Sequence, residues 1–203
     1  QRIKNETQYD VVGPNLGLTI KRFQQDVLNI QRFGAHLKDM GYESVGIWGY
    51  SIGSPRALVA SLFSNIFDFV IMNFLADSFP QAVLSGVATT GVAQKIRQHV
   101  SDAELEELWS PLSPGHYTEY FKRFPNHVRL IQPKYDLVFG EENNRRMVEK
   151  LQNYVPNIDI EYGDFGHSTY GRGKYLIPSI RKNAQFVIKN LPQRCSSKNL
   201  SRR

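Results

Sequence analysis

Apolar residues are spaced at two different periods along the chain. Between residues 19 and 40 they recur at steps of three and four, which is typical of a helix that packs one face on a core; the stripe consists of Ile20, Phe23, Val27, Ile30, Phe33, Leu37 and Met40. Gly41 follows and predicts the C-terminal cap of this helix. Residues 44–48 and 67–75 are instead nearly continuous apolar runs, as in strands buried on both faces of a parallel sheet. A second helix is predicted between these strands, from about residue 52 to residue 62.

The same alternation returns in the second half of the chain. Strands are predicted at 128–131 and 158–162, and helices at 142–154 and 175–191. Because helices alternate with strands, the pattern predicts the α/β fold class, as a three-layer sandwich with a mostly parallel sheet. With 203 residues, of which 41% are hydrophobic, the chain is long enough for one domain with a core, and we place that domain at residues 1–191.

Residues 76–124 interrupt the alternation. Short helical pieces are separated there by Pro80, Pro111 and Pro114. The run Ser101-Asp102-Ala103-Glu104 is a capping box, which predicts a helix that ends near Trp109. We expect a helical insertion after the strand at 67–75, lying over the edge of the sheet either as additional packing helices or as a lid that shapes a pocket.

The candidate chemistry begins between the first predicted strand and the second predicted helix, at Gly49-Tyr50-Ser51-Ile52-Gly53. This is the Gly-x-Ser-x-Gly signature of a nucleophile elbow, in which a strained turn exposes the serine at a helix N-terminus and the glycines let neighbouring backbone pass close by. By chance alone about one chain of this length in fifteen would contain such a string, so its placement between strand and helix gives it weight. A serine hydroxyl also needs a histidine base and a carboxylate that orients the histidine.

The histidines differ in where the predicted strands would place them. His167 follows the strand at 158–162, and the carboxyl ends of parallel strands share one edge of the sheet, so His167 is predicted beside Ser51 as the base. His127 precedes its strand and belongs at the opposite edge. His36 and His99 have no strand to direct them, and His116 reaches the site only if the insertion folds over it.

Three aspartates compete for the role of the orienting acid. Asp136 lies just beyond the strand at 128–131 and is the preferred candidate. Asp77, which follows the strand at 67–75, is the first rival. Asp164 is the second, although it stands only three residues before His167. A capping or surface role for Asp136 is the remaining alternative.

The order Ser51, Asp136, His167 is that of the α/β-hydrolase superfamily. Residues 18 to 190 resemble the C-terminal two-thirds of such an enzyme, since the Ser51 motif matches the elbow, Lys134-Tyr135-Asp136-Leu137-Val138 resembles the acid loop and Phe165-Gly166-His167-Ser168 resembles the histidine loop. The layout is similar to esterases related to dienelactone hydrolase and acetylxylan esterase. This resemblance implies a serine hydrolase that cleaves a small-molecule ester or acyl substrate through an acyl-enzyme. The alternatives are a peptidase or thioesterase with the same triad, or a truncated, non-catalytic binding module.

The resemblance also implies what lies outside the matched region. Members of this superfamily carry three or four strands and a helix before the long helix, and only about 18 residues precede that helix here, so we expect an N-terminally incomplete fold whose open sheet edge favours self-association. The missing part usually supplies one of two oxyanion donors. Only the backbone N–H of Ile52 is assigned to that role, and the loss of one donor typically lowers the rate by ~10²-fold or more.

Composition narrows the class of partners. The net charge is +6, but six basic residues fall in the last 22 positions, which predicts a basic flexible tail at 192–203 and no surface for nucleic acid. No apolar run approaches the ~20 residues of a membrane span. The single cysteine, Cys195, excludes a disulfide within the chain and a zinc site built on cysteines, and favours a reducing, cytoplasmic compartment.

Three further expectations concern small sites. No metal-binding or dinucleotide-binding motif is present, so we expect no metal and no cofactor. Tyr50 is predicted to contact the substrate, with packing beneath the elbow as the alternative. Arg56 is expected to face solvent, with recognition of an acidic substrate group as the alternative.

Overall fold

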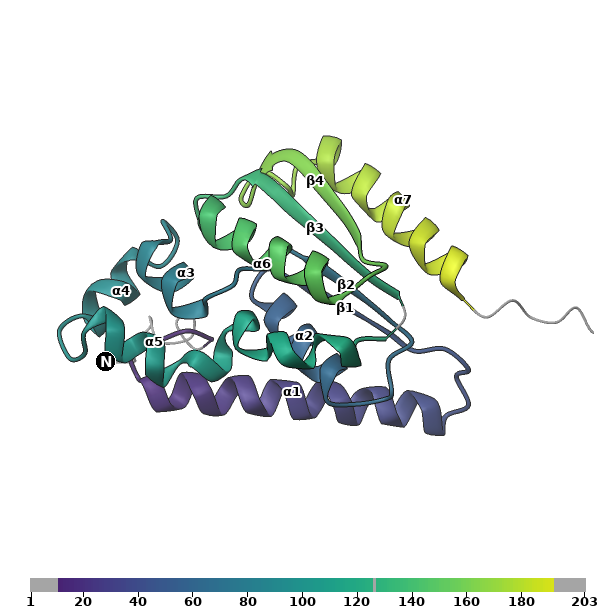
Figure 1. The fold of residues 1–203 in the computed structure, drawn as a ribbon, viewed down its shortest axis with the longest axis horizontal. Helices are drawn as coiled ribbons and strands as arrows, with labels where there is room; N and C mark the ends of the chain where they lie inside the picture. The colour runs from purple at the N-terminus through teal and green to yellow at the C-terminus, as the bar shows by residue number, and fades with distance from the viewer. Residues whose placement is uncertain (1–10, 126, 192–203) are drawn as a thin grey trace, which may run out of the picture.

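The computed structural model describes residues 11–125 and 127–191, as one sheet covered by helices (Figure 1). The helices and strands alternate along the chain as the sequence pattern predicts. Their bounds in chain order are α1 (Leu16–Asp39), β1 (Gly46–Tyr50), α2 (Gly53–Leu62), β2 (Phe69–Asn73), α3 (Phe79–Ser85), α4 (Thr90–Ile96), α5 (Asp102–Leu108), η1 (Ser110–Leu112), η2 (Pro114–Arg123), β3 (His127–Tyr135), α6 (Glu141–Tyr154), β4 (Asp159–Gly166) and α7 (Gly173–Asn190), where η marks a 3₁₀ helix.

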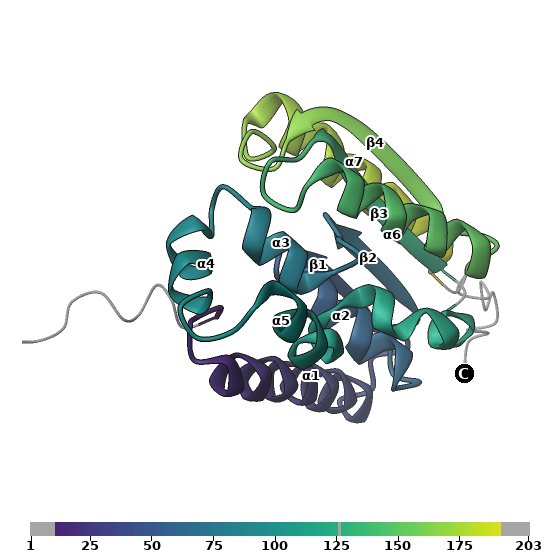
Figure 2. The same ribbon diagram turned by 60° about the vertical axis from the view of Figure 1, so that its left-hand side comes forward.

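The four strands lie in the order β1-β2-β3-β4, and every neighbouring pair is parallel. Helices cover both faces of this sheet. Phe23 of α1, Leu58 of α2 and Leu151 of α6 belong to the larger apolar core on one face, whereas α7 covers a smaller core on the other face that contains Phe74 and Ile131 (Figures 1 and 2). The predicted fold class, a three-layer α/β sandwich with a parallel sheet, is confirmed.

β3 and β4 are longer than the predicted strands at 128–131 and 158–162. Pro133 explains why the predicted strand at 128–131 was too short. A proline has no N–H to donate to the neighbouring strand, so its presence predicts the end of a strand. In the structure, β3 passes Pro133 with a register shift between Pro133 and Tyr135. β4 likewise continues through Gly163 to Gly166. Both strands therefore end one residue before a predicted site residue.

α1 follows only part of its predicted apolar stripe. Phe23 and Val27 are buried, but Phe33 is 65% exposed and Met40 is 59% exposed, so the expectation that this whole face packs on a core was wrong. An apolar hollow of about 510 Å³ remains between this part of α1 and β1. β1 is at the edge of the described sheet and pairs only with β2. Self-association along this edge stays a prediction.

The segment predicted as an insertion contains α3, α4, α5, η1 and η2. The capping box is present, since the Ser101 side chain accepts from the Glu104 N–H and the Glu104 side chain accepts from the Ser101 N–H. α3 contacts α4 and α5 at one end of the molecule (Figures 1 and 2). η2 instead packs against α2 and α6, and Trp109 is fully buried in the larger core. η2 and Trp109 therefore pack on the core, and a lid role for the segment stays a prediction.

Candidate active site

Ser51 occupies a strained turn directly after β1. Its φ is 50°, in the left-handed region that residues other than glycine rarely adopt. The Ser51 N–H donates to the Asn73 carbonyl at the end of β2 (2.8 Å), and the Ser54 N–H donates to the Ser51 carbonyl (2.9 Å). A Cβ on Gly49 would lie 2.6 Å from the Ser54 Cα, so only glycine fits there, whereas a Cβ on Gly53 would meet no atom within 4 Å among the described residues. The close approach expected at both glycines is found at Gly49 alone.

Asp136 and His167 reach the Ser51 turn from the ends of β3 and β4, which are adjacent strands. Ser51 Oγ lies 2.7 Å from His167 Nε2, and His167 Nδ1 lies 3.2 Å from Asp136 Oδ2. His167 follows β4 and Asp136 follows β3, so the parallel sheet brings both to its carboxyl edge. Asp136 is 1% exposed and His167 is 9% exposed. The three side chains form one continuous hydrogen-bonded chain.

Asp136 is fixed and kept ionised by the donors around it. Its Oδ1 accepts from the backbone N–H groups of Val138 (2.8 Å) and Phe139 (3.0 Å), and its Oδ2 accepts from Asn144 Nδ2 (2.9 Å). Burial by itself raises the pKa of Asp136, but hydrogen bonds from His167, the Phe139 N–H and Asn144 outweigh burial and hold this pKa below its ordinary value. An ionised Asp136 requires a proton on His167 Nδ1, which leaves Nε2 free to accept from Ser51.

The rival carboxylates serve other contacts. Asp77 accepts from Lys150 Nζ (2.6 Å) and Arg146 Nε (3.3 Å), which are ion pairs of α6 with the segment after β2. Asp164 pairs with Lys134 Nζ at the surface (2.5 Å). Neither makes a hydrogen bond with His167 in the described part of the chain.

The other histidines do not reach Ser51. His127 begins β3, at the amino end of the sheet and therefore opposite Ser51. His36, His99 and His116 are exposed, and His116 packs its ring against Tyr117. The segment that contains His116 does not bring it into the site.

An aromatic wall, which the sequence pattern did not predict, surrounds the imidazole. The Phe74 ring lies 4.5 Å from the His167 ring, and Phe139 packs edge-on to it at 4.7 Å. Phe74 is fully buried and has a φ of 68°, which is rare for a bulky residue and marks a position held by its surroundings. Phe74 follows β2 as Ser51 follows β1, so its position after a strand was the available signal.

Tyr50 completes this wall and is half-exposed. Its ring stacks on Tyr170 at 5.7 Å and lies 5.2 Å from Phe74. Burial, together with Tyr170 and Asp136, raises the pKa of Tyr50, so its hydroxyl stays protonated at neutral pH. Tyr50 therefore both packs beside the Ser51 turn and contributes surface next to it.

Asn73 ties the Ser51 turn to the His167 loop. Its carbonyl accepts from the Ser51 N–H and from Ser54 Oγ, both at 2.8 Å. Its side chain accepts from Trp48 Nε1 (2.9 Å) and donates to the Tyr170 hydroxyl (2.6 Å), which in turn donates to Ser179 Oγ (2.7 Å). Asn73 is fully buried, and direct hydrogen bonds of this network connect β1, β2 and the loop after β4.

Replacing Tyr170 by phenylalanine tests this network through stability. The change leaves the buried amide of Asn73 and the hydroxyl of Ser179 without their partner, so we expect the free energy of unfolding to fall by about 1–3 kcal/mol. Urea denaturation measures this loss. Tyr154→Phe is the matched control, because Tyr154 is half-exposed and makes no such bond among the described residues. Equal losses in both variants would contradict the role of the network.

Arg56 corrects the expectation of a solvent-facing arginine. Only 5% of Arg56 is exposed, and its guanidinium donates to Asp26 Oδ2 of α1 and to the Ile52 carbonyl, both at 2.6 Å. The guanidinium also lies over the Phe23 ring. Its role is to fasten α1 and the start of α2 to the Ser51 turn. The wrong expectation came from the general surface preference of arginine, which ion pairing overrides here.

The backbone N–H of Ile52 lies at the N-cap position of α2, next to Ser51. It donates no hydrogen bond to another group within the described ranges, 11–125 and 127–191. Helix N-termini present such N–H groups to negative charge. This donor is therefore available beside Ser51.

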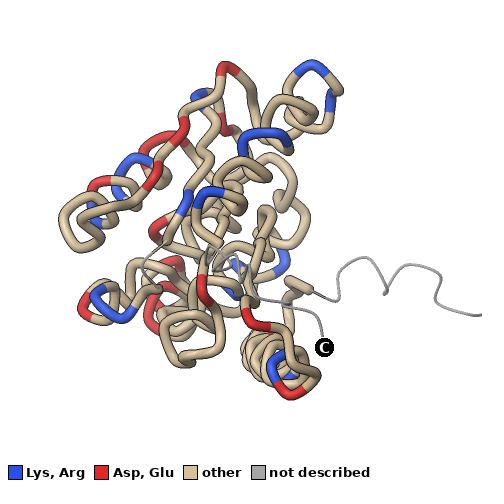
Figure 3. The backbone as a smooth tube through the Cα atoms, turned by 90° about the vertical axis from the view of Figure 1, so that its right-hand side faces the viewer, with Lys and Arg blue, Asp and Glu red and all other residues tan. Residues whose placement is uncertain are grey.

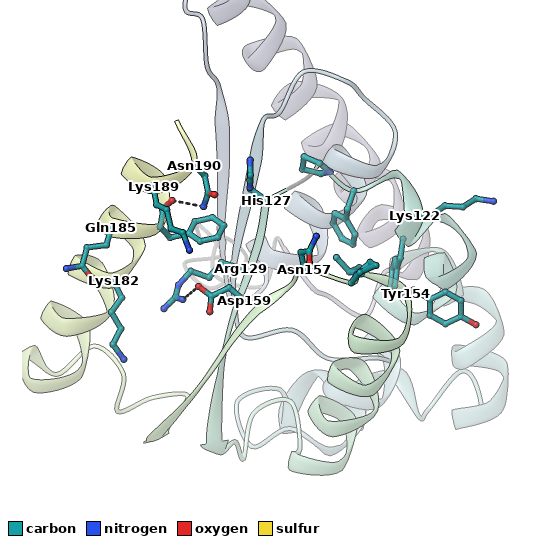
Figure 4. Close-up of a pocket in the computed structure, with 16 residues that line it drawn as sticks. Lys122, His127, Arg129, Tyr154, Asn157, Asp159, Lys182, Gln185, Lys189 and Asn190 are labelled. Carbon is teal, nitrogen blue, oxygen red and sulfur yellow. Dashed lines mark hydrogen bonds and ion pairs between the residues drawn. The ribbon is translucent and has the colours of Figure 1, made fainter. Parts of the chain in front are cut away.

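A large hollow lies away from Ser51. A cavity of about 830 Å³ opens at the amino ends of β3 and β4, where Arg129 is buried and bridges Asp159 and Glu161 (Figure 4). Its position is opposite to the end of the sheet that carries Ser51. A smaller cavity of about 430 Å³ is lined by His167 itself. Size therefore does not locate the site, whereas the hydrogen-bonded side chains do.

Charged residues of both signs are interspersed along the described backbone (Figure 3). The predicted basic tail, 192–203, lies outside the described residues. Within residues 11–125 and 127–191, no cluster of three histidine, cysteine or carboxylate side chains could hold a metal ion. No helix in this part of the chain is both long enough and apolar enough to cross a membrane.

Comparison with solved structures identifies the fold. No protein-family model matches the sequence, and no curated protein matches it by sequence. Solved structures do match, and they show that the chain has the α/β-hydrolase fold. It has this fold in common with hydrolases of three kinds: a peptidase, an esterase and a lipase.

The three structures differ in how much of them the chain matches. An acylaminoacyl peptidase from Pyrococcus horikoshii has a TM-score of 0.60 and 18% identity over 74% of this chain. An esterase from Pyrococcus furiosus has a TM-score of 0.58 and 14% identity over 80%, and a monoacylglycerol lipase from Paleococcus ferrophilus has 0.57 and 13% over 83%. The chain spans 24% of the peptidase, 61% of the esterase and 76% of the lipase.

Proposed function

We propose that the protein is a serine hydrolase that cleaves a carboxylic ester through an acyl-enzyme. The observation that carries this proposal is the continuous chain from Ser51 Oγ to His167 Nε2 (2.7 Å) and from His167 Nδ1 to Asp136 Oδ2 (3.2 Å). The strained φ of Ser51 and its place between β1 and α2 support a nucleophile elbow. We propose residues 1–191 as the hydrolase domain, with 76–124 as its insertion.

The proposed reaction assigns one step to each group. His167 Nε2 takes the Ser51 hydroxyl proton as Ser51 Oγ attacks the ester carbonyl, and Asp136 stabilises the imidazolium that forms. The Ile52 N–H donates to the oxyanion of the tetrahedral intermediate. His167 then gives its proton to the leaving alcohol, and water attacks the acyl-enzyme with His167 again as the base. Tyr50 is proposed to contact the substrate.

A peptide bond is the second candidate substrate, because one of the similar structures is an acylaminoacyl peptidase. Peptidases and esterases share the triad and differ in the pocket, so the comparison of a short ester, a thioester and an aminoacyl amide separates them. The ester proposal requires a large ratio of kcat/KM for the ester to kcat/KM for the amide. This ratio must exceed the ratio of the uncatalysed hydrolysis rates of the same two compounds.

Labelling with a fluorophosphonate tests whether the site is reactive at all. This probe reacts with serines that have an activated hydroxyl, so we expect one label per chain, on Ser51, as located by mass spectrometry of the digested protein. The label should disappear in Ser51→Ala and after heat denaturation. No labelling of the folded chain would favour the non-catalytic binding module instead.

A further inference from the structure

The cavity of about 430 Å³ beside His167 has a composition that the proposed reaction does not explain. It is lined by three separate segments: Val87 in the connection between α3 and α4, the end of β3 with the loop after it, and the stretch from the end of β4 into α7. His167, Ser168 and Thr169 belong to its lining, whereas Ser51 and Ile52 do not. The cavity therefore meets the site on the histidine side.

Apolar side chains on this lining are left open to solvent. Leu137 is 69% exposed, Val87 is 62% exposed and Tyr135 is 59% exposed. Single exposed apolar residues are ordinary, but a contiguous group around a concave surface marks a place where a ligand or partner binds. Tyr135 and Leu137 lie together at the end of β3, and Val87 reaches them from a different segment, where its N–H donates to the Leu137 carbonyl (3.1 Å). They form an apolar wall next to the imidazole.

One charge on the lining is not neutralised. Asp164 pairs with Lys134, so its carboxylate is already matched. Arg172 has no ion pair or side-chain hydrogen bond within the described residues, although it sits at the N-cap position of α7. The N-terminus of this 18-residue helix adds positive potential at the same place. The cavity therefore joins an apolar wall to one available cation.

The position of the cavity decides which part of a substrate enters it. In the proposed reaction, His167 Nε2 gives its proton to the leaving oxygen, so the group attached to that oxygen lies on the histidine side of Ser51. We infer that this cavity binds the leaving group, and that the preferred leaving group is an apolar alcohol or phenol ending in a carboxylate, which Arg172 binds. This inference rests on the proposed function and adds a substrate class to it.

Two acetate esters of equal shape test the inference by turnover. In 3-(4-acetoxyphenyl)propanoate the leaving phenol carries a carboxylate, and in the corresponding propanamide it carries a neutral amide, while two methylenes keep the phenols chemically alike. We expect wild type to favour the carboxylate in kcat/KM, and Arg172→Met to lower the ratio of carboxylate to amide by about tenfold, the effect of one hydrogen bond to a charged group. Arg172→Lys should keep part of the preference.

Arg181→Met is the matched control, because Arg181 is an exposed arginine of the same helix that does not line the cavity. It should leave the ratio within about twofold, since exposed charges beyond about 10 Å are screened at 0.1 M salt. A wild-type ratio near one, or equal changes of the ratio in Arg172→Met and Arg181→Met, would overturn the inference.

A binding measurement separates this inference from the proposed function. Calorimetry on Ser51→Ala with the product 3-(4-hydroxyphenyl)propanoate, and with its amide, needs no turnover. One outcome would uphold the subsite and refute the esterase: the carboxylate binds more tightly than the amide, Arg172→Met weakens its binding by about tenfold, and wild type hydrolyses neither ester. Hydrolysis without any charge preference in rate or binding would uphold the esterase and refute the subsite.

Discussion

Ser51→Ala is expected to lower kcat/KM for p-nitrophenyl acetate by about 10⁶-fold, to the level of the reaction supported by the remaining groups. Alanine removes the only oxygen that lies within hydrogen-bond distance of His167 Nε2 in the described part of the chain, so no acyl-enzyme forms. The assay is release of p-nitrophenolate at matched protein concentration, with the uncatalysed rate subtracted.

The control must show that the variant is folded and that the loss comes from the hydroxyl. Ser54→Ala suits this purpose, because Ser54 Oγ donates to the same Asn73 carbonyl (2.8 Å) but makes no hydrogen bond with His167 among the described residues. We expect Ser54→Ala to lose about 1 kcal/mol of stability and less than tenfold in rate. Ser51→Gly adds a second test, since glycine adopts a φ of 50° without strain and should be as stable as wild type or more stable while it is inactive. A loss below tenfold in Ser51→Ala would refute the proposed nucleophile.

The arrangement of the fold was predictable because burial leaves a periodic trace in the sequence. The run at 67–75 is apolar on both faces, and the structure places β2 there in the interior of a parallel sheet. Strand ends were less predictable, because β3 passes Pro133 by changing its register, which depends on β4 beside it. The prediction that the C-terminal half of α1 is buried was wrong, again because burial depends on the rest of the fold. Phe33 follows the helical period, but this period does not say whether another element packs against it.

The residues of the site also divide into those that the sequence predicts and those that only the fold reveals. Ser51, Asp136 and His167 could be placed together from one rule, that parallel strands share their carboxyl edge. Phe74 and Asn73 follow the same rule, yet a phenylalanine and an asparagine after a buried strand indicate packing as readily as chemistry. Their contacts with His167 and with the Ser51 turn join residues more than 20 positions apart, which no local pattern records. Arg56 was misplaced because its partners, Asp26 and the Ile52 carbonyl, are known only from the fold.

Asp136→Asn should produce the second large effect, a fall in kcat of about 10⁴-fold with the fold retained. The reason lies in the donors around the carboxylate. Its two oxygens accept from the Val138 and Phe139 N–H groups, from Asn144 Nδ2 and from His167 Nδ1. An asparagine offers one acceptor oxygen, so its NH₂ group must face a donor. If that donor is His167, the imidazole turns to the tautomer with a proton on Nε2, which cannot accept from Ser51.

Two other aspartates provide matched comparisons for this prediction. Asp164→Asn loses only the surface pair with Lys134, and we expect a change in kcat below about twofold. Asp77→Asn weakens the ion pairs with Lys150 and Arg146, so we expect lower stability with kcat retained in the folded fraction. Circular dichroism establishes that fraction before the rates are compared. A larger loss of kcat in Asp77→Asn or Asp164→Asn than in Asp136→Asn would assign the orienting carboxylate to one of the rivals.

The pH dependence of stability gives Asp136 a second, independent measurement. The pKa of Asp136 is below its ordinary value in the folded chain, so its stabilising contribution is fully present above the unfolded-state pKa of about 3.9 and is lost as the pH falls through the lower, folded-state pKa. We therefore expect the difference in unfolding free energy between wild type and Asp136→Asn to be constant above pH 5 and to shrink below pH 4. A difference that stays constant throughout the acid range would mean that the carboxylate is not held ionised by His167, Phe139 and Asn144, and the proposed orientation of His167 would lose its physical basis.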